Sequence, residues 1–153
     1  MKLTTRLTTA LVVLLITCWC VSAQENTTNG NEKRVGLNEA AVAHDDDGVA
    51  ALQGTLRTTA LNGSPDSPVT NVRLIVKNTS GISYAFVSGV VTFYDAAGIR
   101  CGEGIFKADA LAVDESFETD SPGVRIRCET TTWRIVATHL LPRSPSTPPV
   151  RQP

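Results

Sequence analysis

The chain has 153 residues, 42% of them hydrophobic, with 14 basic and 15 acidic side chains and a formal net charge of −1. This length suits one domain with a modest core. The balanced charge lacks the broad positive field that nucleic-acid binding requires, so we exclude that class of partner.

The first 23 residues have the three-part plan of a secretory signal peptide. Lys2 and Arg6 are positive, an apolar run of about 12 residues extends from Ala10 to Val21, and Ser22-Ala23 supplies small residues for cleavage. A helix needs about 20 apolar residues to span a bilayer, so a retained anchor is the weaker alternative. We expect a secreted or periplasmic, extracytoplasmic protein with no membrane span after signal removal.

The signal segment also bears on lipidation and on the net charge of the mature chain. A lipoprotein would need a small residue just before an acceptor cysteine, whereas Thr17 precedes Cys18 and Trp19 precedes Cys20. The mature chain would keep 12 basic and 15 acidic residues, because the two basic residues of the signal are lost, and its formal charge would be about −3.

Residues 24–48 are rich in Asn, Thr, Glu, Asp and Gly and are predicted to be a flexible polar linker. Residues 37–43 could form a brief helix, which would be marginal at this length. His44-Asp45-Asp46-Asp47 gathers potential calcium ligands. A calcium loop needs ligands at alternating positions, a glycine turn and a closing bidentate carboxylate, so a solvated acidic linker is the preferred interpretation.

Residues 49–141 carry nearly all the apolar material, and their hydrophobic period is two, which is typical of strands. Tyr84–Tyr94 is apolar on both faces, as expected of a strand in the middle of a sheet, and Asp95–Gly98 supplies a turn. The predicted strands cover residues 52–61, 72–77, 84–94, 99–106, 124–128 and 131–140. They predict an all-β, immunoglobulin-like sandwich of about seven antiparallel strands.

Cys101 and Cys128 are the cysteines that remain after signal removal. In an exported chain two cysteines most simply pair with each other. The bridge would close a loop of about 27 residues, and on the chain-entropy account it would stabilise the fold by about 3.5 kcal/mol. A redox-active pair would be expected in a Cys-x-x-Cys spacing beside a helix start, so we predict a structural disulfide.

Residues 142–153 are rich in proline, which removes backbone donors and favours extended geometry. They are predicted to form a disordered tail.

Three passages of the sandwich region resemble an FxLYD-type domain, a family of immunoglobulin-like modules of exported and envelope proteins. They are Val72 to Ser80 with Asn78-Thr-Ser, Val90 to Gly98 with Phe-Tyr-Asp, and Leu111 to Phe117. The resemblance covers about residues 69–137. Val113-Asp114-Glu115 stands where the family usually has Pro-Gly-Glu, and the cysteine pair is atypical. The resemblance implies a non-enzymatic accessory or interaction module.

No catalytic, cofactor-binding or metal-binding constellation is predicted. The histidines are His44 in the expected linker and His139 at the end of the last strand. A copper sandwich needs two histidines, a cysteine and usually a methionine, but Met1 is lost with the signal. The chain contains no Gly-x-Ser-x-Gly string for a serine hydrolase.

Arg125, Arg127 and Arg134 form a possible partner surface, because the first two project from one face of an expected strand. The alternative is a solvated face partly neutralised by acidic residues, namely Asp109, Asp114, Glu115, Glu118 and Asp120. The loops around Asn78 and Gly98 are a second candidate surface. Asn26, Asn62 and Asn78 match the glycosylation sequon.

We therefore expect an exported, non-enzymatic accessory or interaction module that uses no cofactor and binds a protein or envelope partner. The alternative is a small-ligand carrier or an enzyme with a cleft that sequence does not reveal. His139 beside an acidic group in a pocket would favour that alternative.

Overall fold

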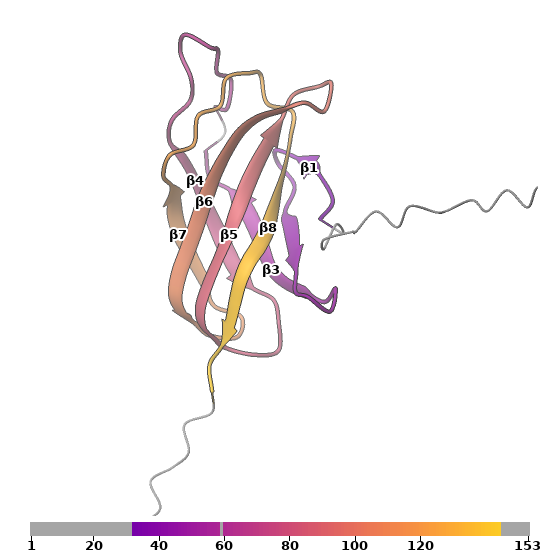
Figure 1. The fold of residues 1–153 in the computed structure, drawn as a ribbon, viewed down its shortest axis with the longest axis vertical. Helices are drawn as coiled ribbons and strands as arrows, with labels where there is room; N and C mark the ends of the chain where they lie inside the picture. Colours follow the sequence, from indigo (N-terminus) through magenta and orange to yellow (C-terminus); the bar gives the residue numbers. More distant parts are fainter. Residues whose placement is uncertain (1–31, 59, 145–153) are drawn as a thin grey trace, which may run out of the picture.

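The computed structural model describes residues 32–58 and 60–144. These ranges form eight β-strands and no helix, in two four-stranded antiparallel sheets packed face to face (Figure 1). The first sheet has the order β1-β8-β5-β6 and the second the order β2-β3-β4-β7. The strands are β1 (Val35–Gly36), β2 (Ala41–His44), β3 (Ala50–Leu56), β4 (Val72–Asn78), β5 (Tyr84–Tyr94), β6 (Arg100–Leu111), β7 (Ser116–Ser121) and β8 (Thr132–Pro142). The predicted immunoglobulin-like β-sandwich is confirmed.

Both sheets contribute alternate side chains to one core. Leu74 and Val76 of β4 are fully buried beneath the second sheet. Phe93, Trp133 and Ile135 are fully buried beneath the first sheet. β5 lies between β6 and β8, as its two apolar faces predicted. Within the described ranges no helix is long and apolar enough to cross a membrane.

The sandwich begins earlier than predicted, so the linker interpretation is corrected for residues 32–48. Ala41 and Ala43 of β2 are fully buried, and Trp133 Nε1 donates hydrogen bonds to the carbonyls of Gly36 at 3.1 Å and Glu39 at 3.3 Å. The expected brief helix at 37–43 is a turn followed by β2. Alanine buries little surface per residue, so the apolar alternation of this segment gives only a weak strand signal. The signal at 1–23 and residues 24–31 lie outside the described residues.

The predicted strands need further corrections at their ends. β7 was not predicted, because Ser116–Ser121 is mostly polar and only Phe117 packs against the core. The strand expected at 124–128 makes only one isolated bridge, between Val69 and Ile126. β8 continues to Pro142, the first residue of the predicted tail, and residues 145–153 lie outside the described part of the chain.

The predicted disulfide between Cys101 and Cys128 is confirmed, with 5.8 Å between the Cα atoms. It joins the start of β6 to the loop that precedes β8. The backbone amide of Arg127 donates to the Cys101 carbonyl at 3.1 Å, so covalent and hydrogen bonds hold this loop against β6.

The residues that carry the family resemblance have structural roles. Asn78 is fully buried, and its Nδ2 donates to the carbonyls of Ile82 at 2.8 Å and Ala112 at 2.9 Å. It thereby ties the β4–β5 loop to the β6–β7 turn. Asp114 adopts a φ of 61°, the left-handed region that favours glycine, at the position where the family usually has Gly. Family membership itself stays a prediction.

Candidate functional site

The two long sides of the sandwich are closed differently. On one side the Ser121 hydroxyl, at the end of β7, donates to the Ile105 carbonyl of β6 at 2.9 Å. On the other side β2 lies beside β8, but in the described chain the only strand paired with β8 there is β1, at Thr132 and Trp133. Beyond those residues no described strand pairs with this side of β8, and we call this stretch the β2–β8 edge.

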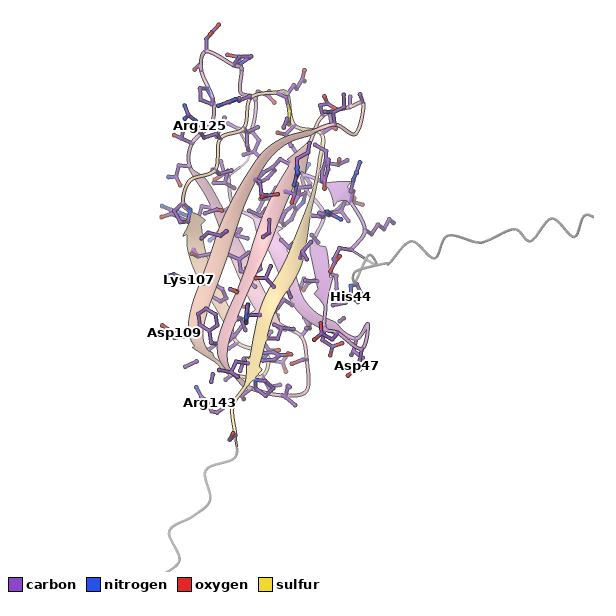
Figure 2. The ribbon with its side chains drawn as sticks, in the orientation of Figure 1. His44, Asp47, Lys107, Asp109, Arg125 and Arg143 are labelled. Carbon is purple, nitrogen blue, oxygen red and sulfur yellow. A yellow bond between two sulfur atoms is a disulfide. The ribbon has the colours of Figure 1, made fainter. Side chains whose placement is uncertain are left out.

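A hollow of about 270 Å³ lies on the β2–β8 edge, and we call it the edge hollow. Figure 2 shows the positions of His44 and Asp47, which belong to β2 and to the turn that follows it. The two histidines, expected in separate parts of the chain, line the same hollow. The lining residues are His44, Asp45, Asp46, Asp47, Ile82, Tyr84, Ala137, Thr138, His139, Leu140 and Pro142.

The acidic wall of the edge hollow is the tight turn between β2 and β3. Asp45 Oδ1 accepts hydrogen bonds from the backbone amides of Asp47 at 3.0 Å and Val49 at 2.8 Å. Gly48 takes a φ of 79°, which the turn requires. In the residues that the structure describes, no group of three or more His, Cys, Asp or Glu side chains is placed to hold a metal ion. The acidic run is thus part of the fold, and one of its carboxylates shapes the turn.

Glu32, His44 and Arg134 form a second polar group at the same edge. Glu32 is only 7% exposed, and burial raises the pKa of its carboxyl above the usual 4.5. Its own backbone amide, the nearby Arg134 guanidinium and His44 offset this only in part. Among the residues that the structure describes, Glu32 Oε1, His44 Nδ1 and Arg134 Nε are buried and have no hydrogen-bond partner. Each such atom costs free energy to bury.

No family model, curated protein or solved structure matches this chain.

The three predicted arginines are spread over two elements. Arg125 and Arg127 are exposed in the loop before β8, beside the start of β6, and Figure 2 shows Arg125 far from His44 and Arg143. Arg134 lies in β8 opposite Thr92, half-buried, with its guanidinium carbon 5.9 Å from the centre of the Tyr94 ring. Their binding of a partner stays a prediction.

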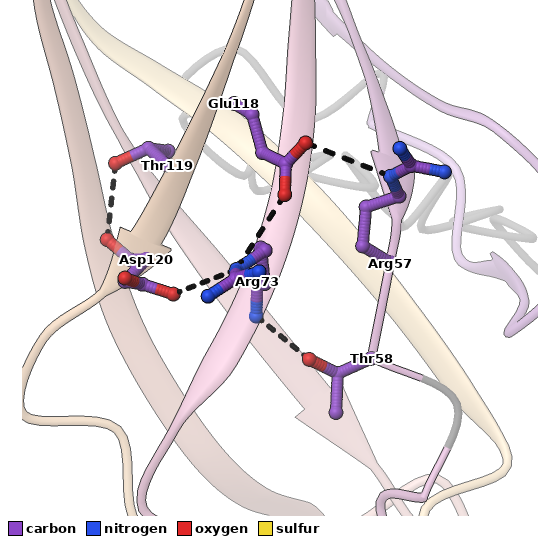
Figure 3. Close-up of polar contacts among 6 residues, drawn as sticks. All are labelled: Arg57, Thr58, Arg73, Glu118, Thr119 and Asp120. Atoms are coloured by element: carbon purple, nitrogen blue, oxygen red, sulfur yellow. Dashed lines mark hydrogen bonds and ion pairs between the residues drawn. The ribbon is translucent and has the colours of Figure 1, made fainter.

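Several acidic residues expected beside these arginines pair with other cations (Figure 3). Glu118 lies 3.7 Å from Arg57 and 3.5 Å from Arg73, and Asp120 lies 3.2 Å from Arg73. All four side chains are at least 42% exposed. Exposed pairs contribute little to stability, so this network is a solvated face of the second sheet.

The glycosylation sequons differ in accessibility. Asn62 is exposed, whereas Asn78 is fully buried and its side-chain amide is held by two carbonyls. Asn26 lies outside the described residues. Asn78 therefore acts as a structural residue in the folded chain.

The sequence did not reveal that Glu32 and His44 lie beside β8. The available signal was the alternation of Ala41 and Ala43 with Val42 and His44, in a segment otherwise typical of a linker.

Proposed function

We propose that this protein is an exported, non-enzymatic interaction module that binds an extended segment of a partner at the β2–β8 edge. The observation that carries the proposal is the edge of β8 from Ala137 to Pro142, which lines the edge hollow and with which no strand of residues 32–58 and 60–144 pairs on that side. An open strand edge presents N–H and C=O groups to an added strand, and pockets for alternate side chains supply specificity.

The composition of the edge hollow favours a basic side chain from the partner. The exposed Ile82 and the half-buried Leu140 offer apolar surface to an aliphatic stem, while Asp45, Asp46 and Asp47 give the rim negative charge. Lys and Arg combine such a stem with a cationic head.

Export is supported by the signal-like residues 1–23 and by the disulfide, which is typical of oxidising compartments. The resemblance to FxLYD-type modules supports an accessory role.

The alternative, a small-ligand carrier, is favoured by His139 lying on the same hollow as acidic residues. We prefer the partner peptide because the hollow, at about 270 Å³, is below the roughly 300–1,000 Å³ typical of small-molecule sites. A strand edge can also form backbone hydrogen bonds with a peptide along its whole length, which a small ligand cannot match.

The test is selection of peptides from a random library on the protein with its disulfide intact, followed by hydrogen exchange of the complex. We expect bound peptides to contain Lys or Arg and to protect those amides of residues 137–141 that point away from β5. Asp47→Lys should weaken binding about ten-fold or more, since it reverses a charge at the rim. Asp66→Lys, in the exposed β3–β4 loop, is the matched control. Protection confined to other strands would refute the proposal.

A further inference from the structure

The outward face of the first sheet has an apolar middle. The register of β6, β5 and β8 places Ile105, Val90 and Val136 in one row across the three strands. Ile105 is 53% exposed, and Val90 and Val136 are half-buried. A second apolar pair, Phe86 and Leu141, lies further along the same face, with Leu141 57% exposed. Contiguous apolar rows on an exposed sheet face are typical of a contact surface.

The charges of β6 are arranged antisymmetrically about this row. Glu103 and Lys107 each lie two residues from Ile105, on opposite sides, and both are exposed. Arg100 lies opposite Tyr94, and Asp109 lies opposite Phe86. Tyr94 and Phe86 are equally far from Val90 along β5, on opposite sides of it. The strand thus carries plus, minus, apolar, plus and minus in order, and Figure 2 shows Lys107 and Asp109 along β6. Within one chain Arg100 Nη1 lies 2.6 Å from Glu103 Oε2, so these two charges already form an ion pair, which would face Asp109 and Lys107 of a second copy.

We propose that this face binds a second copy of the same chain, face to face, about a two-fold axis along the Ile105–Val90–Val136 row. That axis reverses the strand direction, so Glu103 of one copy opposes Lys107 of the other, and Arg100 opposes Asp109. Each pair occurs twice, because a two-fold interface is self-complementary. Packed sheets lie about 10 Å apart, a separation that long charged side chains bridge.

Two alternative arrangements of a second copy fit less well. An axis along β5 would place Asp109 opposite Leu141, leaving the carboxylate against an apolar side chain. Edge-to-edge pairing of β6 is obstructed, because the carbonyls of Cys101 and Ile105 already accept hydrogen bonds from Arg127 and Ser121. The charges therefore favour a contact through the outward face of the first sheet. This face is distinct from the β2–β8 edge.

The experiment is sedimentation velocity at low salt on the protein with its disulfide intact. Protein concentrations extend to about 1 mM chain, so that weak specific complexes are detected. We expect a reversible dimer. Ile105→Glu should abolish it, since two carboxylates would meet on the axis. Glu103→Lys and Lys107→Glu should each weaken it about ten-fold, since each variant replaces two attractions by two repulsions.

The quadruple variant Arg100→Glu/Glu103→Arg/Lys107→Glu/Asp109→Lys discriminates between arrangements, because it keeps the ion pair within each chain and restores opposite charges across the proposed axis. We expect it to dimerise within about three-fold of the wild type. Arg125→Glu, outside the face, is the control for charge alone, and thermal unfolding checks that each variant is folded. A monomer throughout the range, a dimer unaffected by Ile105→Glu, or a quadruple variant that dimerises more weakly than both single variants would overturn the proposal.

Discussion

Glu32 combines nearly complete burial with an incomplete set of partners. Its carboxyl is 7% exposed, and one of its oxygens has no hydrogen-bond partner. Burial penalises the ionised form more than Arg134 and His44 favour it, so the pKa is raised. The folded chain therefore binds the proton more tightly than the unfolded chain. This contribution to stability is present at low pH and is lost as pH rises from about 4.5 through the raised pKa.

We predict that Glu32→Gln raises the midpoint of thermal unfolding at pH 7, because it removes a buried charge that the site does not fully compensate. The difference from the wild type should shrink as the pH falls below the unfolded-state value of 4.5, where both chains are neutral at this position. Glu129→Gln, at an exposed position, is the control and should change little. A midpoint lowered at pH 7 would show that Arg134 depends on the carboxylate for stability.

In β6 one residue interrupts the alternation of exposed and buried side chains. The strand keeps alternate exposed and buried positions from Gly102 to Lys107, but near its end Ala110 has a φ of 56°. That left-handed conformation costs a non-glycine residue about 1–2 kcal/mol. After this residue Leu111 is buried against the core and opposite Tyr84.

We predict that Ala110→Gly stabilises the protein by about 0.5–1 kcal/mol, because relief of the backbone strain exceeds the added entropy of glycine in the unfolded chain. Chemical denaturation measures the change. Ala108→Gly, two residues earlier in regular strand, is the matched control. It should destabilise by about 1 kcal/mol, since Ala108 packs against the core. Equal effects of the two substitutions would contradict this interpretation of β6.

At the scale of the whole molecule, the N-terminal strands complete the sandwich. β2 extends the second sheet beside β3, and β1 caps the first sheet beside β8. Trp133 contacts this segment directly, because its indole nitrogen donates to the carbonyls of Gly36 in β1 and of Glu39 in the turn before β2. The domain thus includes residues that composition alone assigns to a linker.

We predict that a chain beginning at Val49 loses cooperative unfolding or melts well below the wild type. It would expose the core beneath Ala41 and Ala43 and leave the Trp133 N–H without its acceptors. Trp133 fluorescence should shift to the red, as its environment becomes aqueous. A chain ending at Ser144 is the control, since it keeps every described residue. An unchanged melting profile for the first truncation would restore the linker interpretation.

The fold was predictable where burial by large side chains imposes a period of two. Val72–Val76 and Tyr84–Tyr94 became β4 and β5, and the cysteine pair became a disulfide. β2 and β7 were missed because alanine and polar residues leave little hydrophobic signal. Their pairing comes from neighbouring strands, which satisfy backbone hydrogen bonds whatever the side chains are.

By itself the sequence determined a two-layer β-fold with one disulfide, because both follow from local alternation and from the count of cysteines. Only the tertiary structure decided which segments share a surface. It brought His44 beside His139, moved Arg134 away from Arg125, and aligned Ile105, Val90 and Val136 in one row. Those neighbours are set by strand order and register, which arise from contacts between residues distant in the chain.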